Sequence, residues 1–196
     1  MVGLGNQDIG LSTPELYAYR DRAEFFEEIS GLYPIDANVT ELDEPERVEI
    51  LLVGPSYFSL LGVQPQLGRV FRADEDTAPG IAEVVVLSDR LWKRRFGGRA
   101  DAIGRKLRID SDWYEVVGVM PPGFDHPGRA LRSGVEMWAP AGFRAAPFVP
   151  LDRARGRYPL TGGLARLKRG VSVAEAQQRL AAFAAELRAE YPADYP

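Results

Sequence analysis

The segment from Gly54 to Arg69 restricts the folds open to this chain more than any other. It reads Gly-Pro-Ser-Tyr-Phe-Ser-Leu-Leu-Gly-Val-Gln-Pro-Gln-Leu-Gly-Arg. An apolar run typical of a strand ends at Gly54, a short amphipathic helix follows, and Gly62 is suited to end that helix in the left-handed conformation. A second turn with proline and glycine closes on Arg69. No residue here belongs to a catalytic motif, so the pattern favours a binding or transmitting domain over an enzyme.

Length and composition indicate an ordinary globular protein. The chain has 196 residues, of which 45% are hydrophobic and 27% charged, which suits one domain or two small intertwined ones. The net charge is -4 and the isoelectric point is near 5.2, which argues against nucleic acid as a partner. Cysteine is absent, and this excludes a thiolate metal site and a catalytic cysteine.

Apolar runs of the length needed to span a bilayer, about 18 residues, are missing from the sequence. The longest runs, Ile50–Val53 and Val84–Leu87, have the length of strands. The first residues lack the basic and apolar regions of a signal peptide. The sequence therefore predicts either a cytosolic protein or part of a larger one.

Hydrophobic periodicity predicts alternating helices and strands. The predicted helices cover residues 12–26, 56–61, 88–97, 101–103 and 173–191. The predicted strands cover residues 37–42, 47–53, 83–87, 105–110, 113–119, 135–138 and 158–167. Capping boxes begin at Ser12 and Ser172. The hairpin loop at Ser111-Asp112 lacks Asn-Gly, so a bulge or a looser connection is expected there. This alternation indicates an α+β or small α/β architecture.

Residues that carry catalysis are scarce. His126 is the only histidine, it lies in a turn, and no Gly-x-Ser-x-Gly motif supplies a nucleophile for it; a solvated loop histidine is expected. The acidic cluster at residues 74–76 does not match a calcium loop and is expected to be an exposed, capped turn. A pair of carboxylates that meets in space, including Asp110 and Asp112 at the hairpin tip, is an alternative that the sequence leaves open. The sequence predicts no cofactor and no metal.

Aromatic residues suggest where a partner would bind. Trp92 has the spacing of a core residue, whereas Trp113 and Trp138 lie at strand ends, where a core or an interface role is plausible. Phe143, Phe148 and Val149 form an apolar stretch in the loop rich in proline that spans residues 125–156. Apolar residues on such a loop indicate a candidate partner surface, with packing of the loop onto the domain as the alternative.

Four motifs in order resemble the extracytoplasmic core domain of MacB-type, FtsX-like ABC transporter permeases. They begin at Tyr57-Phe58, at Val84, at Ile103-Gly104 and at Gly163, and the resemblance covers residues 11–192. Its signature residues have a structural role: Tyr57, Phe58, Leu61, Gly62, Gly68, Arg69, Phe71, Trp92, Phe96, Gly97, Gly98, Gly104, Gly118, Val119, Pro121, Gly123 and Phe124. Residues 129–157 match no pattern of that family.

The resemblance implies mixed β-sheets with packed helices. A porter-like subdomain would comprise residues 12–55 and 157–191, a second α/β subdomain residues 56–156, and tails residues 1–11 and 192–196. It further implies a domain of the periplasm or cell exterior, with no enzymatic activity and no ATPase of its own. In the full-length protein the domain would be anchored to the inner membrane.

The partners implied by the resemblance are the permease's own transmembrane helices, a cytoplasmic ABC ATPase and a second permease copy; the transported substrate is not named. The domain would transmit conformational change and contact substrate or envelope partners, with its first and last helices directed toward the membrane. A free-standing ligand-binding protein and a carboxylate-dependent hydrolase are the alternatives. The first would show a signal peptide or a cytosolic start in the complete gene, and the second would show converging carboxylates with raised pKa values.

Overall fold

The computed structural model describes residues 11–40, 45–76, 83–126, 134–142, 159–160 and 162–193. The helices are α1 (Thr13–Arg22), α2 (Tyr57–Leu61), α3 (Asp89–Phe96) and α4 (Val173–Glu190), with 3-10 turns η1 (Ala73–Asp76) and η2 (Ala100–Ala102). The strands are β1 (Leu11–Ser12), β2 (Phe26–Val39), β3 (Glu46–Val53), β4 (Leu67–Gly68), β5 (Val84–Leu87), β6 (Lys106–Ile109), β7 (Asp112–Val119), β8 (Met137–Pro140), β9 (Pro159–Leu160) and β10 (Gly162–Leu167).

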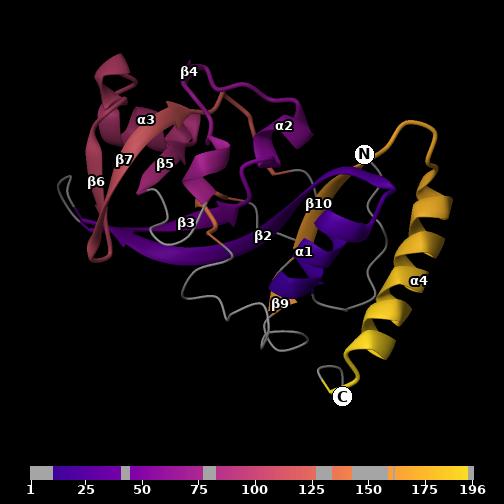
Figure 1. Cartoon of the computed structure of the whole chain (residues 1–196). Coiled ribbons are helices and arrows are strands. Elements are labelled where there is room, and N and C mark those ends of the chain that lie inside the picture. The colour runs from indigo at the N-terminus through magenta and orange to yellow at the C-terminus, as the bar shows by residue number, and fades with distance from the viewer. Residues whose placement is uncertain are drawn as a thin grey trace.

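One mixed sheet organises the molecule (Figure 1). Seven of its eight strands follow the order β10-β2-β3-β8-β5-β7-β4, and β6 pairs with β2 and β7. The pairs β3–β8 and β5–β7 are parallel and the others are antiparallel. Short β1 and β9 form a separate two-stranded ladder. The mixed sheet with packed helices confirms the predicted α+β class.

Strand β2 is longer and begins earlier than predicted. The sequence placed Phe26 on the first helix and began a strand at Ala37, whereas α1 ends at Arg22 and β2 spans 14 residues from Phe26. Gly31 and Pro34 interrupt the local strand signal. The strand forms because β10 pairs with its first half and β3 with its second half, both registers meeting at Leu32. Only the tertiary structure brings these partners together.

The predicted capping box at Ser12 is confirmed, whereas at Ser172 the serine cap is present and the Glu175 side chain pairs with Arg179. Ser12 and Glu15 form a reciprocal capping box at the start of α1, and Ser172 caps α4 by accepting a hydrogen bond from the Glu175 N–H at 3.2 Å. Ser88 caps α3 in the same way at 3.1 Å. These side chains satisfy N–H groups that have no partner within their helices.

The β6–β7 hairpin closes through a tight two-residue turn, so the predicted looser connection is wrong. Ile109 pairs directly with Asp112, and Asp110 adopts the left-handed conformation with φ 51°. The carboxylate of Asp110 accepts hydrogen bonds from the backbone N–H of Asn38, at 3.0 Å, and from its amide, at 3.1 Å. Contacts with β2 therefore stabilise a turn that lacks Asn-Gly.

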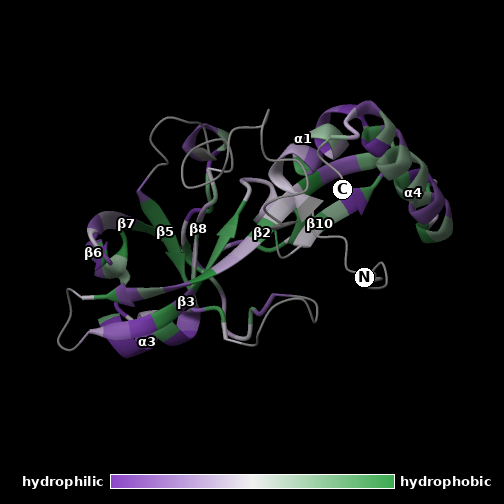
Figure 2. Ribbon diagram, turned by 90° about the horizontal axis from the view of Figure 1, so that it is seen from below, coloured by the Kyte–Doolittle hydropathy of each residue, from purple (hydrophilic) through white to green (hydrophobic). Residues whose placement is uncertain are grey.

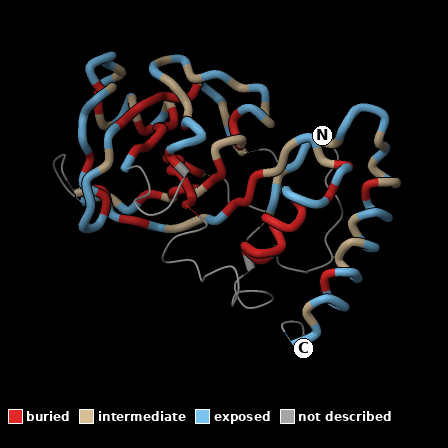
Figure 3. The backbone as a smooth tube through the Cα atoms, viewed as in Figure 1, coloured by how far each residue is buried: buried red, intermediate tan, exposed pale blue. Residues whose placement is uncertain are grey.

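Two apolar clusters fill the two faces of the sheet. Buried side chains of β2, β3, β5 and β8 pack under α3 on one face, and another set packs with α2 on the other. Figure 2 shows apolar strands inside and a polar outer surface on α3, while Figure 3 shows that α4 is far less buried than the sheet. The sheet passes through both predicted subdomains, since β3 pairs with β8; the division itself stays a prediction.

Candidate functional site

Helices α1 and α4 lie against each other at one end of the molecule (Figure 1). The rings of Tyr19 and Phe183 are 5.3 Å apart, and the Arg22 guanidinium lies 5.2 Å from the centre of the Phe183 ring. Ala176, fully buried on α4, packs in the same cluster as Ala23 and Phe25. The apolar side of the last helix is thus the surface that joins α4 to α1 and to the start of β2.

An ion pair closes this helix pair at its edge. Arg22 Nη1 lies 2.8 Å from Glu190 Oε2, and the hydrogen bond with Glu190 raises the pKa of the Arg22 guanidinium. Burial, together with the charge of Glu15, raises the pKa of Tyr19 to about 12. Tyr19 is therefore neutral at physiological pH and acts as an apolar surface for α4.

Helix α2 is clamped to β2 and β10 by polar contacts that the sequence did not reveal. Ser56 Oγ donates to the Ile29 carbonyl at 3.1 Å, and the Gly54 N–H donates to Ser30 Oγ at 3.0 Å. Arg166 of β10 donates to the carbonyls of Ser59 and Leu60, both at 2.8 Å. The Ser59 carbonyl also accepts a hydrogen bond from the Gly62 N–H, at 3.0 Å, at the end of the helix. No local signal predicts the clamp, because its partners lie between 24 and 107 positions apart in the chain.

An aromatic cluster surrounds α2 on its inner side. Tyr57 and Phe58 are fully buried; Phe58 contacts the rings of Phe71, Phe124 and Trp138, with centroids 5.7, 6.1 and 5.9 Å away. Of the two roles predicted for Trp138, the structure shows the core one: it is completely buried. Burial raises the pKa of Tyr57. The cluster joins α2, β8 and the segment after β7 into one body.

His126 is half-buried and packs on this cluster, so the prediction of a solvated histidine is wrong. The Tyr57 hydroxyl lies 2.8 Å from His126 Nδ1, and burial lowers the pKa of the imidazole. The sequence placed His126 in a turn but did not indicate that the turn folds back on α2.

The acidic turn is not exposed throughout, which corrects a second prediction. Asp74 is exposed, but Glu75 is buried and receives two hydrogen bonds from Arg69, at 2.9 and 2.7 Å. The Arg72 N–H adds a third at 2.8 Å. Burial by itself raises the pKa of Glu75, but the Arg69 and Arg72 contacts outweigh it and leave the pKa below its usual value. Glu75 therefore stays ionised, and its hydrogen bonds hold the turn after Arg69 in place.

Gly68 and Gly118 allow two backbones to touch. They face each other across the β4–β7 pair. A Cβ at Gly118 would lie 2.1 Å from the Arg69 carbonyl oxygen, and one at Gly68 would lie 2.2 Å from that of Val117. The contact fixes the second turn of the Gly54–Arg69 segment against β7.

The remaining signature residues have ordinary structural places. The Trp92 indole donates to the Arg99 carbonyl at 2.8 Å; Phe96 and Val119 are buried. Leu61 is half-buried on α2 and Pro121 half-buried after β7. Left-handed glycines follow helices or occupy turns: Gly62, Gly97, Gly98, Gly104 and Gly123. That these residues form a family signature stays a prediction. The candidate partner surface at Phe143, Phe148 and Val149 lies outside the described residues.

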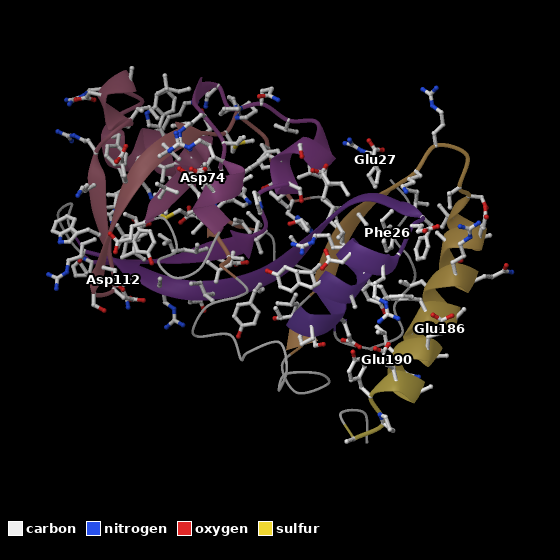
Figure 4. The ribbon with its side chains drawn as sticks, in the orientation of Figure 1. Phe26, Glu27, Asp74, Asp112, Glu186 and Glu190 are labelled. Carbon is white, nitrogen blue, oxygen red and sulfur yellow. The ribbon has the colours of Figure 1, made fainter. Side chains whose placement is uncertain are left out.

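The carboxylates considered for catalysis lie on separate elements. Asp74 is on η1 and Asp112 at the start of β7, apart from each other in Figure 4. Asp110 and Asp112 are exposed, and the pKa of Glu75 is lowered rather than raised. Among the described residues, no three acidic or histidine side chains are grouped to hold a metal ion. No helix in those parts of the chain has the length and apolar character to cross a bilayer.

Comparisons with known proteins agree with this architecture. The family described as MacB-like periplasmic core domain matches residues 3–183. The periplasmic region of MacB from Actinobacillus actinomycetemcomitans superposes with a TM-score of 0.68 at 13% identity, covering 97% of this chain and 81% of that one. The extracellular domain of the noncanonic ABC-type transporter YknZ from Gram-positive bacteria gives 0.68 at 13% identity, covering 95% and 87%.

A domain of a putative permease protein from Porphyromonas gingivalis has the same fold, with a TM-score of 0.60 at 20% identity and coverage of 89% and 70%. None of the curated proteins matches this sequence. The family match covers nearly the whole chain, so the chain belongs to the MacB-like periplasmic core domain family. It is a periplasmic or extracellular domain of a membrane-anchored ABC transporter permease.

Proposed function

We propose that this domain is a mechanical relay that carries movement of the permease's membrane spans to its far end. The observation that carries the proposal is β2, whose 14 residues extend over about 46 Å at about 3.3 Å per residue. Its first residue, Phe26, packs in the α1–α4 cluster, and its last, Val39, pairs with Ile109 of β6. One hydrogen-bonded strand thus connects the helix pair with the far hairpin.

The position of the helices suits two flanking membrane spans. The start of α1, beside β9, and the end of α4 lie on the same side of the molecule, the lower side in Figure 1. Helix α1 is only about 15 Å long, and its last residue, Arg22, is ion-paired with Glu190 at the end of α4. Both helices can therefore approach one lipid surface together.

The proposal assigns partners but no catalysis. Movement would enter from the permease's own membrane spans, driven by a cytoplasmic ABC ATPase, with a second permease copy as a further partner. The far end would contact substrate or envelope proteins, and Phe143, Phe148 and Val149 stay a candidate partner surface. Glu75 supports a non-enzymatic role, because a buried carboxylate with a lowered pKa is suited to an ion pair and not to a general acid.

A spin-label experiment tests the relay. The chain has no cysteine, so Gln178→Cys on α4 and Lys106→Cys on β6, both exposed, can be labelled selectively in a full-length permease with its other cysteines removed. With the ATPase in lipid discs, we expect the label-to-label distance to stay constant on ATP binding while the Lys106→Cys label moves relative to the lipid headgroups. A change in label-to-label distance without movement at Lys106→Cys would contradict transmission.

A pair of labels placed close together at the far end is the matched control. Lys106→Cys and Asp101→Cys lie on β6 and η2, both exposed and both at the far end. Their separation reports local distortion only. We expect it to stay constant as well; if it changes with ATP, the far end deforms locally and movement of the Lys106→Cys label does not report transmission along β2.

A further inference from the structure

The hydrogen bond between Tyr57 and His126 connects two segments that are 69 residues apart in sequence. Tyr57 lies on α2 and His126 lies in the segment that follows β7. Their rings are nearly parallel, with centroids 5.8 Å and planes 12° apart. In the same segment Phe124 contacts Trp138 at 5.3 Å. This segment is therefore held against α2 and β8 by two ring contacts and by one hydrogen bond whose direction depends on the position of a proton.

The protonation state of the pair follows from its neighbours. Burial raises the pKa of Tyr57, and the Trp138 side chain opposes that rise, so the Tyr57 hydroxyl keeps its proton. The hydroxyl proton is then directed to His126 Nδ1, which must be unprotonated to accept it. With the hydroxyl as donor, the imidazole is neutral and carries its proton on Nε2.

Protonation of the imidazole breaks this arrangement. A proton on Nδ1 faces the hydroxyl proton of Tyr57, and the hydroxyl must turn to become an acceptor. The proton of the Tyr57 hydroxyl then has no other hydrogen-bond acceptor in the described part of the chain. An unsatisfied hydroxyl and a charged ring inside an aromatic cluster are both unfavourable.

We propose that His126 and Tyr57 form a pH-sensitive latch that holds the segment after β7 against α2 while His126 is neutral and releases it on protonation. The released segment includes Phe124, so the aromatic cluster around α2 loosens with it. The signal to which the latch responds is acidification of the compartment outside the membrane. The inference does not depend on the relay, because it concerns the isolated domain.

Burial is the main influence on the pKa of His126. Helix α2 and strand β8 carry no charged residue. Asp125, its neighbour in sequence, is exposed, and Glu136, which precedes β8, is paired with Arg90 and Arg94. Burial is the only cause that lowers the pKa of His126, and the hydrogen bond from Tyr57 to the neutral ring acts in the same direction.

Proton NMR of the single imidazole provides the direct test. In the wild-type domain we expect His126 to titrate below the ordinary value of about 6.5, and the amide signals of Phe124 to His126 to shift with the same midpoint. Tyr57→Phe keeps the stacked ring but removes the hydroxyl, so the pKa of His126 should rise by roughly half a unit or more. Tyr33→Phe, on the exposed part of β2, is the control and should leave it unchanged.

Thermal unfolding across pH gives a second readout. Because the folded pKa of His126 is depressed, its contribution to stability is present above the unfolded pKa and is lost as the pH falls through the folded one. The side chain in His126→Gln can still accept the hydrogen bond from the Tyr57 hydroxyl but does not titrate. When the pH falls from about 7.5 to about 5, the Tm of this variant should therefore drop by no more than about half of the drop seen in the wild type. The latch would be overturned if the pKa of His126 in the wild type were at or above its ordinary value. It would also be overturned if the Tm of His126→Gln fell with pH as much as that of the wild type.

Discussion

At the residue scale, Gly118 is a position where the fold tolerates little change. A Cβ there meets the backbone of Arg69, with the carbonyl oxygen at 2.1 Å, and a backbone cannot move aside as the tip of a side chain does. We expect Gly118→Ala to lower the free energy of unfolding by about 3 kcal/mol, measured as a shift in the urea midpoint. Gly162→Ala, with nothing within 4 Å of its Cβ, is the control and should be neutral or slightly stabilising.

Also at the residue scale, the ion pair between Arg69 and Glu75 contributes stability that depends on pH. The pKa of Glu75 is lowered in the folded state, so this stability is present above the unfolded pKa and is lost as the pH falls through the folded one. We expect Arg69→Met to cost roughly 1–3 kcal/mol at neutral pH and to weaken the dependence of stability on pH in the acid range. Urea unfolding at pH 7 and at about pH 3 measures both.

The double variant Arg69→Met/Glu75→Gln tests whether this stability comes from the interaction between the two side chains. Removing the carboxylate charge together with its partner avoids a buried unpaired charge, so the double variant should be less destabilised than the sum of the two single variants. Additive losses would mean that Arg69 acts through packing alone.

At the scale of elements, α4 is attached by a narrow contact surface. Phe183 supplies both the ring contact with Tyr19 and the surface under Arg22, and most of α4 is exposed. We expect Phe183→Ala to cost about 2 kcal/mol, less than a fully buried phenylalanine would, and to speed amide hydrogen exchange in α4 while β3 and β5 stay protected. Phe183→Leu keeps an apolar contact and should have a smaller effect; equal effects would mean that the contact depends on the aromatic ring itself and not on apolar volume.

At the scale of the whole molecule, the continuous sheet predicts one cooperative unfolding transition. Strand β2 pairs with β10 and β3, and β3 pairs with β8, so the sheet crosses the predicted boundary between subdomains. The chain's three tryptophans, Trp92, Trp113 and Trp138, all lie between residues 56 and 156. Their fluorescence and a dye on Gln178→Cys of α4 should report the same urea midpoint. Earlier melting at α4 would show that the helix pair unfolds separately.

The sequence by itself determined the local features of this domain. Serine caps, glycine stops and apolar periodicity are satisfied within a few residues, so they gave the starts of α1, α3 and α4, the buried strand β5 and the helix of the Gly54–Arg69 segment. The order of four such motifs also indicated the family, which the match to residues 3–183 confirms.

Only the tertiary structure decided what depends on distant partners. The first half of β2 is a strand because β10 lies beside it, the Asp110 turn is tight because Asn38 donates to it, and Glu75 is buried because Arg69 neutralises it. His126 is held at Tyr57 for the same reason. In each case the free energy comes from contacts between residues far apart in the chain, which local propensity does not encode.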